Sequence, residues 1–438
     1  MKPLQVGLLG IGTVGLGTWT VLRRNAEEIA RRAGRPIRIT WIAERALERA
    51  REVTRGATDV HLTDDAAKVL THRDIDIVVE LIGGIEPART FILQAIDNGK
   101  HVVTANKALL ARHGNEIFAA AHRKGVTVAF EGAVAGGIPI IKALREGLTA
   151  NRIEWIAGII NGTSNFILSE MRAKGASFKT VLAEAQARGY AEADPTYDIE
   201  GIDAAHKLTI MSAIAFGVPM QFDKVYTEGI SKLTGEDISY AEEMGYRIKL
   251  LGITRRTATG IELRVHPTLI PAKRLIANVE GVMNAVLVKG DAVGATMYYG
   301  AGAGAEPTAS AVIADLVDVT RMHTSDPEHR VPHLAFQPDQ LSDLPFLPMG
   351  EVETSYYLRM RVEDKPGVLA DITRILADRE ISIDAMIQKE PSEGEEQTDI
   401  ILLTHKCIEK QVVAAIAEIE ALATVRGKVV RIRLEELN

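Results

Sequence analysis

The sequence predicts an α/β protein with three folded parts: a doubly wound parallel sheet at the N-terminal end, a central α+β domain and a C-terminal βαββαβ module. Apolar runs of strand length alternate with helical patterns over residues 4–130, which is typical of a parallel sheet. A glycine-rich turn follows the first run, and the order strand, helix, strand, strand, helix, strand is found after residue 355. At 438 residues the chain is too long for one ordinary core.

The expected boundaries follow from these patterns and from a proline-punctuated stretch after the central domain. We expect an N-terminal domain over 1–135, completed by a helix over 306–325, a central domain over 136–305, a linker over 326–350 and the module over 351–438.

Composition restricts the class of function. The net charge is −7 and no block of Lys or Arg is present, so nothing attracts a nucleic-acid backbone or an anionic membrane. No apolar run approaches the ~18 residues of a membrane span, and the N-terminus lacks the pattern of a signal peptide. The single cysteine, Cys407, excludes an intrachain disulfide and a cysteine metal cluster. We therefore expect a cytoplasmic protein that acts on a small molecule.

The first apolar run, Leu4–Leu9, leads into a turn with G-x-G-x-x-G spacing. A helical pattern from Val14 to about Arg32 and a second strand over Ile37–Ala43 follow, so the turn opens a βαβ unit. Such a turn lets a pyrophosphate approach the backbone at a helix N-terminus. We therefore expect a Rossmann-type domain that binds a dinucleotide. The expected contacts are Gly10, Gly12, Thr13, Val14 and Gly15.

The end of the second strand leaves the coenzyme open. Glu44 could accept a hydrogen bond from a ribose 2′-hydroxyl, as in NAD, whereas Arg45 could bind the 2′-phosphate of NADP. Arg49 and Arg51 add positive charge and favour NADP, although a solvated helix face explains them equally well.

The alternation continues to residue 130. The expected elements are a strand over Ile75–Ile82, a helix over Pro87–Asn98, a strand over His101–Thr104, a helix from about Leu109 to Arg123 and a strand over Val126–Phe130. Ligands of such sheets bind beyond the carboxyl ends of the strands, where Thr104 and Lys107 lie. Lys107 could reach the coenzyme or an anionic substrate group there, or it could be an ordinary lysine of the next helix.

Two further turns carry polar groups. Glu131 is followed by the small-residue turn 132–139, which can present several backbone carbonyls to a monovalent cation or can be a plain tight turn. The strand over Ile153–Ile160 ends in Asn161, Gly162 and Thr163, which can hydrogen-bond a ligand or cap the helix that begins near Phe166.

The stretch from Gly201 to Phe216 predicts a helix on which Asp203 and Lys207 stand i, i+4. An exposed ion pair would explain the spacing but not the apolar residues on all sides, so we expect a buried, functional pair. A dehydrogenase acting on an alcohol needs such a group to take or return the hydroxyl proton. In the preceding loop, Glu192, Asp194 and Asp198 could bind a substrate ammonium.

A glycine-rich run precedes a helix that extends to about Arg321. The glycines of residues 300–304 allow close approach by a ligand, or they mark a tight crossover between domains.

Taken in order, the motifs of this chain resemble one family over nearly the full length. They are Gly10–Gly15, Thr104–Lys107, Asn161–Asn165, Gly189–Pro195, Asp203–Lys207, and Gly302–Gly304 with Pro307 and Thr308. This pattern resembles the homoserine dehydrogenase family in its longer form. The resemblance implies reversible NAD- or NADP-dependent oxidation of L-homoserine to L-aspartate 4-semialdehyde, on the route to threonine and methionine. It places catalysis and subunit contacts in the central domain.

The resemblance also implies roles for single residues. Lys207 would transfer the proton, Lys107 would lie near coenzyme and substrate, and Asp203 would position the substrate or the lysine. The implied substrate contacts are Glu192 for the amino group, Asp198, Asn161, Gly162 and Thr163. The implied coenzyme contacts further include Arg45, Thr104, Gly302 and Glu306. The implied sodium site comprises Glu131, Val134, Gly136 and Ile138. Ala46 stands where many members carry an acid, which leaves coenzyme preference open.

The C-terminal module resembles an ACT domain, including the turn at Asp364–Gly367. Its expected elements are a strand from Ser355, a helix to about Asp378, strands over Ile381–Gln388 and Thr398–Thr404, a helix from about Glu409 to Ala421 and a strand over Val429–Leu434. The resemblance implies binding of a small amino acid, with threonine as the expected feedback inhibitor. The alternative is a dimerisation module without ligand. We expect a homodimer or homotetramer.

Two other functions compete. The first is another NAD(P)-dependent dehydrogenase with an ACT module, such as a 2-hydroxy-acid enzyme, which would need a catalytic histidine with an acidic partner. His206, His266 and His323 lack comparably placed partners in the sequence. The second is a non-catalytic nucleotide or amino-acid sensor, which would not need the Asp203 and Lys207 pair.

Overall fold

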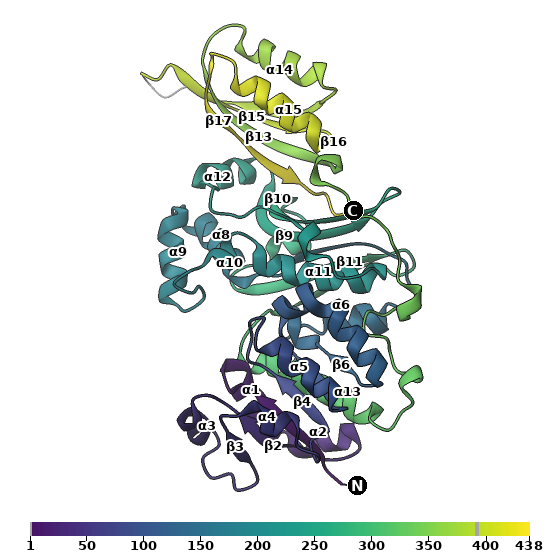
Figure 1. Cartoon of the computed structure of the whole chain (residues 1–438). Helices are drawn as coiled ribbons and strands as arrows, with labels where there is room; N and C mark the ends of the chain where they lie inside the picture. Colours follow the sequence, from purple (N-terminus) through teal and green to yellow (C-terminus); the bar gives the residue numbers. More distant parts are fainter. Residues whose placement is uncertain (1, 390–393) are drawn as a thin grey trace. The chain divides into compact units, whose positions relative to one another are not determined.

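The computed structural model describes residues 2–389 and 394–438 (Figure 1). Contacts divide the chain into two compact units. The first unit comprises Met1–Gly162, Asp203–Val225 and Val282–Leu344, and the second comprises Thr163–Ile202, Tyr226–Gly281 and Pro345–Asn438. The chain therefore alternates between the two units instead of completing one before beginning the other.

The first unit contains the predicted doubly wound sheet. Its strands are β1 (Leu4–Leu9), β2 (Ile37–Ala43), β3 (His61–Thr63), β4 (Ile77–Glu80), β5 (His101–Thr104) and β6 (Val128–Ala129). They are parallel and lie in the order β3-β2-β1-β4-β5-β6. The order reverses between β1 and β4, and in such sheets the crevice at the reversal is where nucleotides bind.

Helices surround this sheet, and one of them was predicted wrongly. They are α1 (Thr13–Arg24), α2 (Ala26–Ala33), α3 (Leu47–Val53), α4 (Ala66–Leu70), α5 (Ala88–Asp97), α6 (Lys107–Lys124) and α13 (Ala305–Met322). The single helix expected over residues 14–32 is two helices, because the chain leaves helical geometry at Asn25, where φ is −107° and ψ is 20°. Asparagine favours such breaks since its side chain competes for backbone hydrogen bonds.

The core of this sheet includes the late helix α13. Val312 and Leu316 of α13 are completely buried against β1 and α1 residues. The helices can approach closely because Gly17 lacks a side chain: a Cβ there would lie 2.3 Å from the carbonyl oxygen of Ala305. The start of α13 is thereby fixed beside the glycine-rich turn.

The remaining strands of the first unit form an antiparallel ribbon in which β11 pairs with both neighbours. Its strands are β7 (Ile153–Ile159), β11 (Met283–Gly290) and β12 (Gly294–Ala301). The unit also holds the short helix α7 (Ile140–Lys142) and nearly all of α11 (Ile202–Phe216), which is buried from Asp203 to Phe216.

The second unit combines central strands with the C-terminal module. Its helices are α8 (Gly162–Lys174), α9 (Phe178–Ala187), α10 (Thr196–Ile199), α12 (Gly235–Glu243), α14 (Val368–Asp378) and α15 (Glu409–Glu420). Its strands are β8 (Tyr226–Thr227), β9 (Tyr246–Arg256), β10 (Ile261–Pro271), β13 (Glu353–Glu363), β14 (Ile383–Gln388), β15 (Gln397–Thr404), β16 (Cys407–Ile408) and β17 (Val425–Leu434). The predicted βαββαβ order is confirmed, and α14 and α15 lie on the same face of the module's sheet (Figure 1).

The module's sheet continues that of the central strands, in the order β9-β10-β17-β13-β15-β14. β17 pairs in parallel with β10 through Thr268 with Arg433 and Leu269 with Leu434. The sequence predicted a linker followed by a module but not this strand pairing, because the pairing joins strands that are far apart in the chain.

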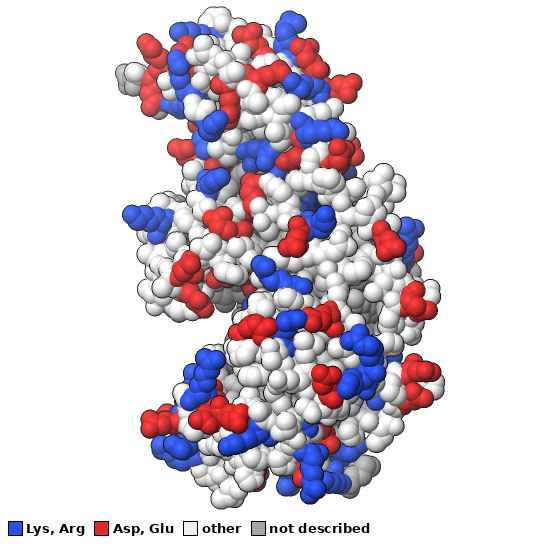
Figure 2. Space-filling view, viewed as in Figure 1, with Lys and Arg blue, Asp and Glu red and all other residues white. Residues whose placement is uncertain are grey.

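Charges of both signs are mixed on the face shown in Figure 2. Within residues 2–389 and 394–438, no helix is long and apolar enough to cross a membrane.

Candidate active site

The side chains of Asp203 and Lys207 meet on α11 with a second lysine. Lys207 Nζ lies 2.7 Å from Asp203 Oδ2, and Lys107 Nζ lies 3.1 Å from Asp203 Oδ1. The amide of Asn161 donates a hydrogen bond of 3.0 Å to Asp203 Oδ2. One carboxylate therefore holds two ammonium groups and an amide that come from three separate elements.

Burial determines the electrostatics of this cluster. Asp203 is 8% exposed and Lys207 is 7% exposed, so the predicted buried i, i+4 pair is confirmed. Burial alone would raise the pKa of Asp203, but Lys207 and Lys107 hold that pKa below its usual range. The carboxylate is therefore ionised at neutral pH. The side chain of Lys107 is 41% exposed, so its ammonium lies where the buried pair meets solvent.

Lys207 is oriented by a second contact. Its Nζ donates a hydrogen bond of 2.7 Å to the carbonyl oxygen of Ile160, at the end of β7. The ammonium is thus held between a carboxylate and a backbone carbonyl.

Lys107 is positioned by a rigid turn between β5 and α6. Asn106 caps α6 by accepting from the N–H of Leu109 at 3.1 Å, and its amide donates to the carbonyl of Gly84 at 2.7 Å. The buried Thr104 hydroxyl donates to Glu80 at 2.7 Å and accepts from the N–H of Asn106. The hydrogen bonds of Thr104, which was expected at the coenzyme, therefore fix the turn that presents Lys107.

A cleft of about 380 Å³ opens at the carboxyl ends of β1, β2 and β4. Three predicted coenzyme residues, Gly10, Gly12 and Arg45, are among its lining residues. A Cβ at Gly15 would lie 2.3 Å from the carbonyl oxygen of Gly10, so this glycine allows the helix to pack on the strand. Nothing lies within 4 Å of a Cβ built on Gly12, which leaves open space in the cleft. The first backbone N–H groups of α1 have no side-chain cap, as an anion site requires.

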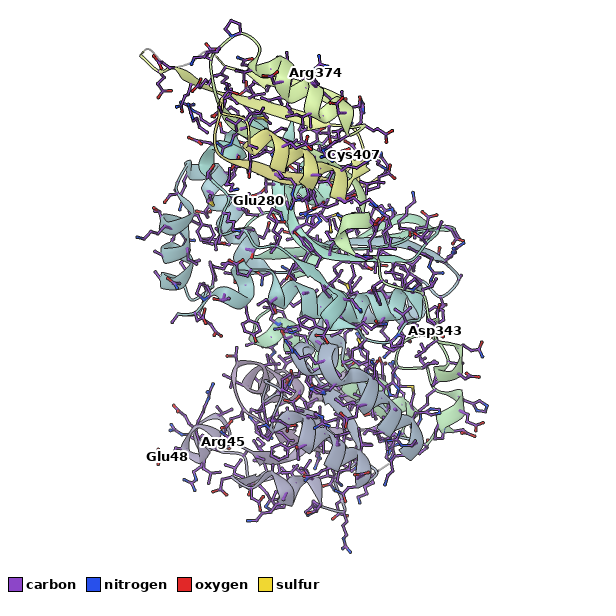
Figure 3. The ribbon with its side chains drawn as sticks, turned by 45° about the horizontal axis from the view of Figure 1, so that its top comes forward. Arg45, Glu48, Glu280, Asp343, Arg374 and Cys407 are labelled. Atoms are coloured by element: carbon purple, nitrogen blue, oxygen red, sulfur yellow. The ribbon has the colours of Figure 1, made fainter. Side chains whose placement is uncertain are left out.

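The acid and the arginine at the end of β2 both line this cleft. Glu44 accepts hydrogen bonds from the backbone N–H groups of Ile11 at 2.9 Å and Ala46 at 3.2 Å. Arg45 follows it and precedes α3, whose first turn carries Glu48 (Figure 3). Both groups that could distinguish NAD from NADP are therefore present in the cleft.

Gly302 and Glu306, expected at the coenzyme, make internal contacts. A Cβ at Gly302 would lie 1.7 Å from Asn284 Oδ1, so the glycine is needed for packing. The half-exposed carboxylate of Glu306 accepts two hydrogen bonds from Arg24 of α1, at 2.9 and 2.8 Å. These contacts hold the start of α13 against Asn284 and α1.

The turn after β6 surrounds a buried carboxylate. Glu131 accepts hydrogen bonds from the backbone N–H groups of Ile141 at 2.9 Å and Lys142 at 2.8 Å, while its own N–H donates to Asp315 at 2.8 Å. Burial raises the pKa of Glu131 to about 7, and the two backbone donors offset only part of that shift. Asp315 is also buried, and its pKa is raised by burial and by Glu131. Within the described residues no group of three His, Cys, Asp or Glu could hold a metal ion.

The expected substrate loop lies in the second unit. Glu192 is exposed and Asp198 half-buried. Asp194, which the sequence offered with Glu192 and Asp198 for a substrate ammonium, accepts from the N–H and hydroxyl of Thr196 and shapes the turn before α10. Thr163 donates to the carbonyl of Tyr190 at 2.7 Å, so it stabilises the loop that carries Glu192.

Comparison with known proteins decides the family. Family models match "Homoserine dehydrogenase, NAD binding domain" at residues 10–131, "Homoserine dehydrogenase" at 139–317 and "ACT domain" at 356–424. A homoserine dehydrogenase of Pseudomonas aeruginosa is 65% identical over 438 residues, which is 100% of both chains. The chain belongs to the homoserine dehydrogenase family.

Solved structures of this family agree with the fold. A homoserine dehydrogenase from Thiobacillus denitrificans shares 73% identity and gives a TM-score of 0.96, covering 100% of this chain and 99% of that one. A homoserine dehydrogenase from S. aureus shares 33% identity with a TM-score of 0.75, and 99% of each chain is covered.

Membership of the homoserine dehydrogenase family decides among the functions that the sequence left open. A homoserine dehydrogenase is an NAD(P)-dependent oxidoreductase that interconverts L-homoserine and L-aspartate 4-semialdehyde, a step of threonine and methionine biosynthesis, and this chain is an enzyme of that class. The alternatives of a 2-hydroxy-acid dehydrogenase and a non-catalytic sensor are therefore wrong.

Some residues that line the cleft were not predicted from the sequence. They are Asp64, Ala66, Glu86, Pro87 and Phe91. Asp64 and Ala66 follow β3, a strand of three residues that is too short to show an alternating pattern. Glu86 and Pro87 immediately precede α5, in the segment that connects it to β4, and their place in a loop beyond the carboxyl end of a strand was the signal that could have found them.

Proposed function

We propose that Lys207, as a neutral amine, accepts the hydroxyl proton during oxidation of L-homoserine and, as an ammonium, returns it during reduction of the semialdehyde. The observation that carries this proposal is the shared carboxylate, with Asp203 holding the Lys207 ammonium at 2.7 Å and the Lys107 ammonium at 3.1 Å. The nicotinamide coenzyme, when bound, would supply the acceptor for the hydride that leaves the alcohol carbon. Asp203 compensates the positive charge that Lys207 carries once it holds the transferred proton, and the carbonyl of Ile160 orients that ammonium.

A substrate panel tests whether the site recognises the amino group of L-homoserine. NAD(P)-linked oxidation should be measured with L-homoserine, D-homoserine and L-lactate. We expect turnover with L-homoserine and at least about 10²-fold lower kcat/KM with the other two, because the amino group and its configuration are recognised. Equal turnover of L-lactate would contradict the proposal.

We also propose that Glu192 and Asp198 bind the substrate ammonium and that the partly exposed Lys107 lies beside the substrate. Support comes from the charge of these groups, from the exposed position of Glu192 and from the family resemblance. Asn161, Gly162 and Thr163 remain proposed substrate residues. Glu192→Gln and Asp198→Asn should raise the KM for L-homoserine without changing that for the coenzyme. Unchanged KM values in both variants would refute this role.

For the coenzyme, we propose that the pyrophosphate lies at Gly10, Gly12, Thr13, Val14 and Gly15. The open space at Gly12 and the uncapped start of α1 support this. We favour NADP over NAD because Arg45 lines the cleft, and the backbone N–H groups of Ile11 and Ala46 already engage Glu44. Thr104, Gly302 and Glu306 would then act by supporting the surrounding turns.

We propose a sodium ion at the carbonyls of Val134, Gly136 and Ile138 beside Glu131. The fit is chemical: hard oxygen donors suit such a cation, and Glu131 is a buried carboxylate that accepts hydrogen bonds from the backbone N–H groups of Ile141 and Lys142. Backbone φ values of 54° at Ala135 and 45° at Gly136 turn the chain sharply within the proposed site.

Threonine is the proposed inhibitor that acts through the ACT module. The family match at residues 356–424 supports the module, and the implied pathway supports the effector. The full chain should be titrated with L-threonine, with D-threonine as control. Deleting the module is a poorer test, because the deletion removes Glu435, which forms an ion pair with the buried Arg264 at 2.5 Å. The buried guanidinium would then lack one of its acidic partners. Activity that is indifferent to L-threonine would contradict the effector.

We propose that the enzyme is a homodimer or homotetramer. β12 ends the antiparallel ribbon of the first unit and carries Tyr299, which is 59% exposed. An open strand edge with an exposed aromatic side chain is a surface that association would cover. Light scattering of the purified protein decides between one chain and several.

A further inference from the structure

The strand edge at which β17 joins β10 also holds the short strand β8. β10 pairs with β8 through Arg264 and Val265, and with β17 through Thr268 and Leu269. The last strand of the ACT module and the segment that begins at Tyr226 therefore lie along the same edge of one strand.

A buried arginine connects the two neighbours. Arg433 of β17 is completely buried and donates two hydrogen bonds to Glu409, the first residue of α15, at 2.9 and 2.6 Å. A third hydrogen bond, of 2.9 Å, goes to Glu228, just after β8. The hydroxyl of Tyr226 donates to the same Glu228 oxygen at 2.8 Å. One guanidinium thus links the first turn of a module helix to Glu228.

The segment after Glu228 touches the turn that precedes the catalytic helix. The N–H of Ile230 donates to the carbonyl of Ile199 at 2.8 Å. Gly229 fits closely there: a Cβ would lie 2.3 Å from Glu200 Oε2 and 2.5 Å from the carbonyl oxygen of Ile199. Gly201, with φ of 81°, packs on Val265 of β10. The turn 199–201 is followed in the chain by Ile202 and Asp203.

We propose that Glu228 is a positioning residue for the turn 199–201, and that Arg433 makes this position depend on the state of the ACT module. The inference rests on the proposed regulation of the enzyme through that module. Glu409, Arg433, Glu228 and the Ile230 to Ile199 hydrogen bond form a continuous path from α15 to the turn. A shift of α15 or β17 on effector binding would move Glu228, and with it the turn that leads into α11.

Glu228→Gln is the sharpest test, because it removes the charge and leaves Arg433 paired with Glu409. Without effector, we expect the KM for L-homoserine to rise about fivefold and kcat to stay within about twofold, as for loss of one charge-assisted hydrogen bond. The concentration of L-threonine for half-inhibition should change at least about threefold, since coupling between two sites is reciprocal. Glu228→Asp, which keeps the charge, should recover most of both effects.

Two matched controls separate this role from a general loss of stability. Glu236→Gln removes an exposed charge that pairs with Arg359 of the module at 3.2 Å and should leave both values unchanged. Gly229→Ala should raise the KM, whereas Gly235→Ala, where a Cβ meets nothing within 4 Å, should not. The proposal would be overturned if Glu228→Gln and Gly229→Ala fold and keep the wild-type KM for L-homoserine. It would also be overturned if these variants differ from wild type only in melting temperature. A wild type that ignores threonine would contradict the effector only, because the KM comparison is made without it.

Discussion

Replacing Asp203 by Asn tests the electrostatics of the site, because it keeps the shape of the side chain and removes its charge. Asp203 contacts two ammonium groups at 2.7 and 3.1 Å, and Lys207 is 7% exposed. Leaving a buried ammonium without its counter-ion costs on the order of 3 kcal/mol. The amide can still accept one hydrogen bond, so the variant should fold with a lower melting temperature.

The effect of Asp203→Asn on turnover should be larger than its effect on binding of the coenzyme. We expect kcat for L-homoserine oxidation to fall by about 10²-fold or more, because the proton-transfer group loses its orientation and its compensating charge. Binding of NADPH, measured by fluorescence titration, should be unchanged, since Gly10, Gly12 and Arg45 line a cleft on other elements. A variant with kcat within about twofold of wild type would refute this account.

The same variant has a pH signature. The pKa of Asp203 is lower in the folded protein than in the unfolded chain, so its ionisation stabilises the fold above the unfolded pKa. This stabilisation is lost as pH falls through the lower folded pKa. Thermal unfolding of the wild type should therefore show a contribution that begins to decline below about pH 4 and is lost progressively as the pH falls further, and Asp203→Asn should lack it.

Four further outcomes follow from the geometry of the first unit. In steady-state assays with both coenzymes, Arg45→Ala should raise the KM for NADP⁺ about tenfold and leave the KM for NAD⁺ within about twofold of wild type. Equal effects on the two KM values would show that Arg45 does not recognise the 2′-phosphate. Gly302→Ala should lower the melting temperature, because its Cβ would lie 1.7 Å from Asn284 Oδ1. Gly12→Ala should keep the melting temperature and raise the coenzyme KM; the reverse pattern would contradict the assignment of the two glycines. Because burial raises the pKa of Glu131 to about 7, its protonation stabilises the fold fully below the unfolded pKa and is lost as pH rises through 7. This contribution is on the order of 3 kcal/mol. We therefore expect Na⁺ to raise the melting temperature more at pH 8 than at pH 5, relative to tetramethylammonium at equal ionic strength. An equal rise at both pH values would argue against the cation site.

Local sequence patterns predicted those features of the site that depend only on residues close together in the chain. The spacing of Gly10, Gly12 and Gly15 indicates a tight turn on its own, and the i, i+4 spacing places Asp203 beside Lys207 on one helix face. Both features are fixed within a few residues, so no tertiary information was required.

Contacts between distant segments were beyond reach of the same reasoning. Lys107 and Asp203 lie on different helices, and nothing in either local pattern shows that their side chains meet at 3.1 Å. The pairing of β17 with β10 joins the module to the central strands. In the sequence, Arg433 is one of several basic residues near the C-terminus and is not distinguished from them. Its complete burial is a property of the assembled sheet.

Short elements were lost for a different reason. β3 has three residues, and the break at Asn25 interrupts a helical pattern whose apolar periodicity continues on both sides. Hydrophobic periodicity needs a longer window than these features provide.

Turnover of L-homoserine by Lys207→Met is the decisive test of Lys207 as the proton-transfer residue. Methionine keeps an unbranched side chain in the buried site and removes the ammonium, while Asp203 keeps Lys107 as a counter-ion at 3.1 Å. Lys179→Met, at an exposed position on α9, is the matched control. The account predicts that kcat falls by at least about 10³-fold in Lys207→Met, with NADPH binding and fold retained, and stays at the wild-type value in Lys179→Met. A folded Lys207→Met enzyme that turns over L-homoserine at the wild-type rate would contradict it.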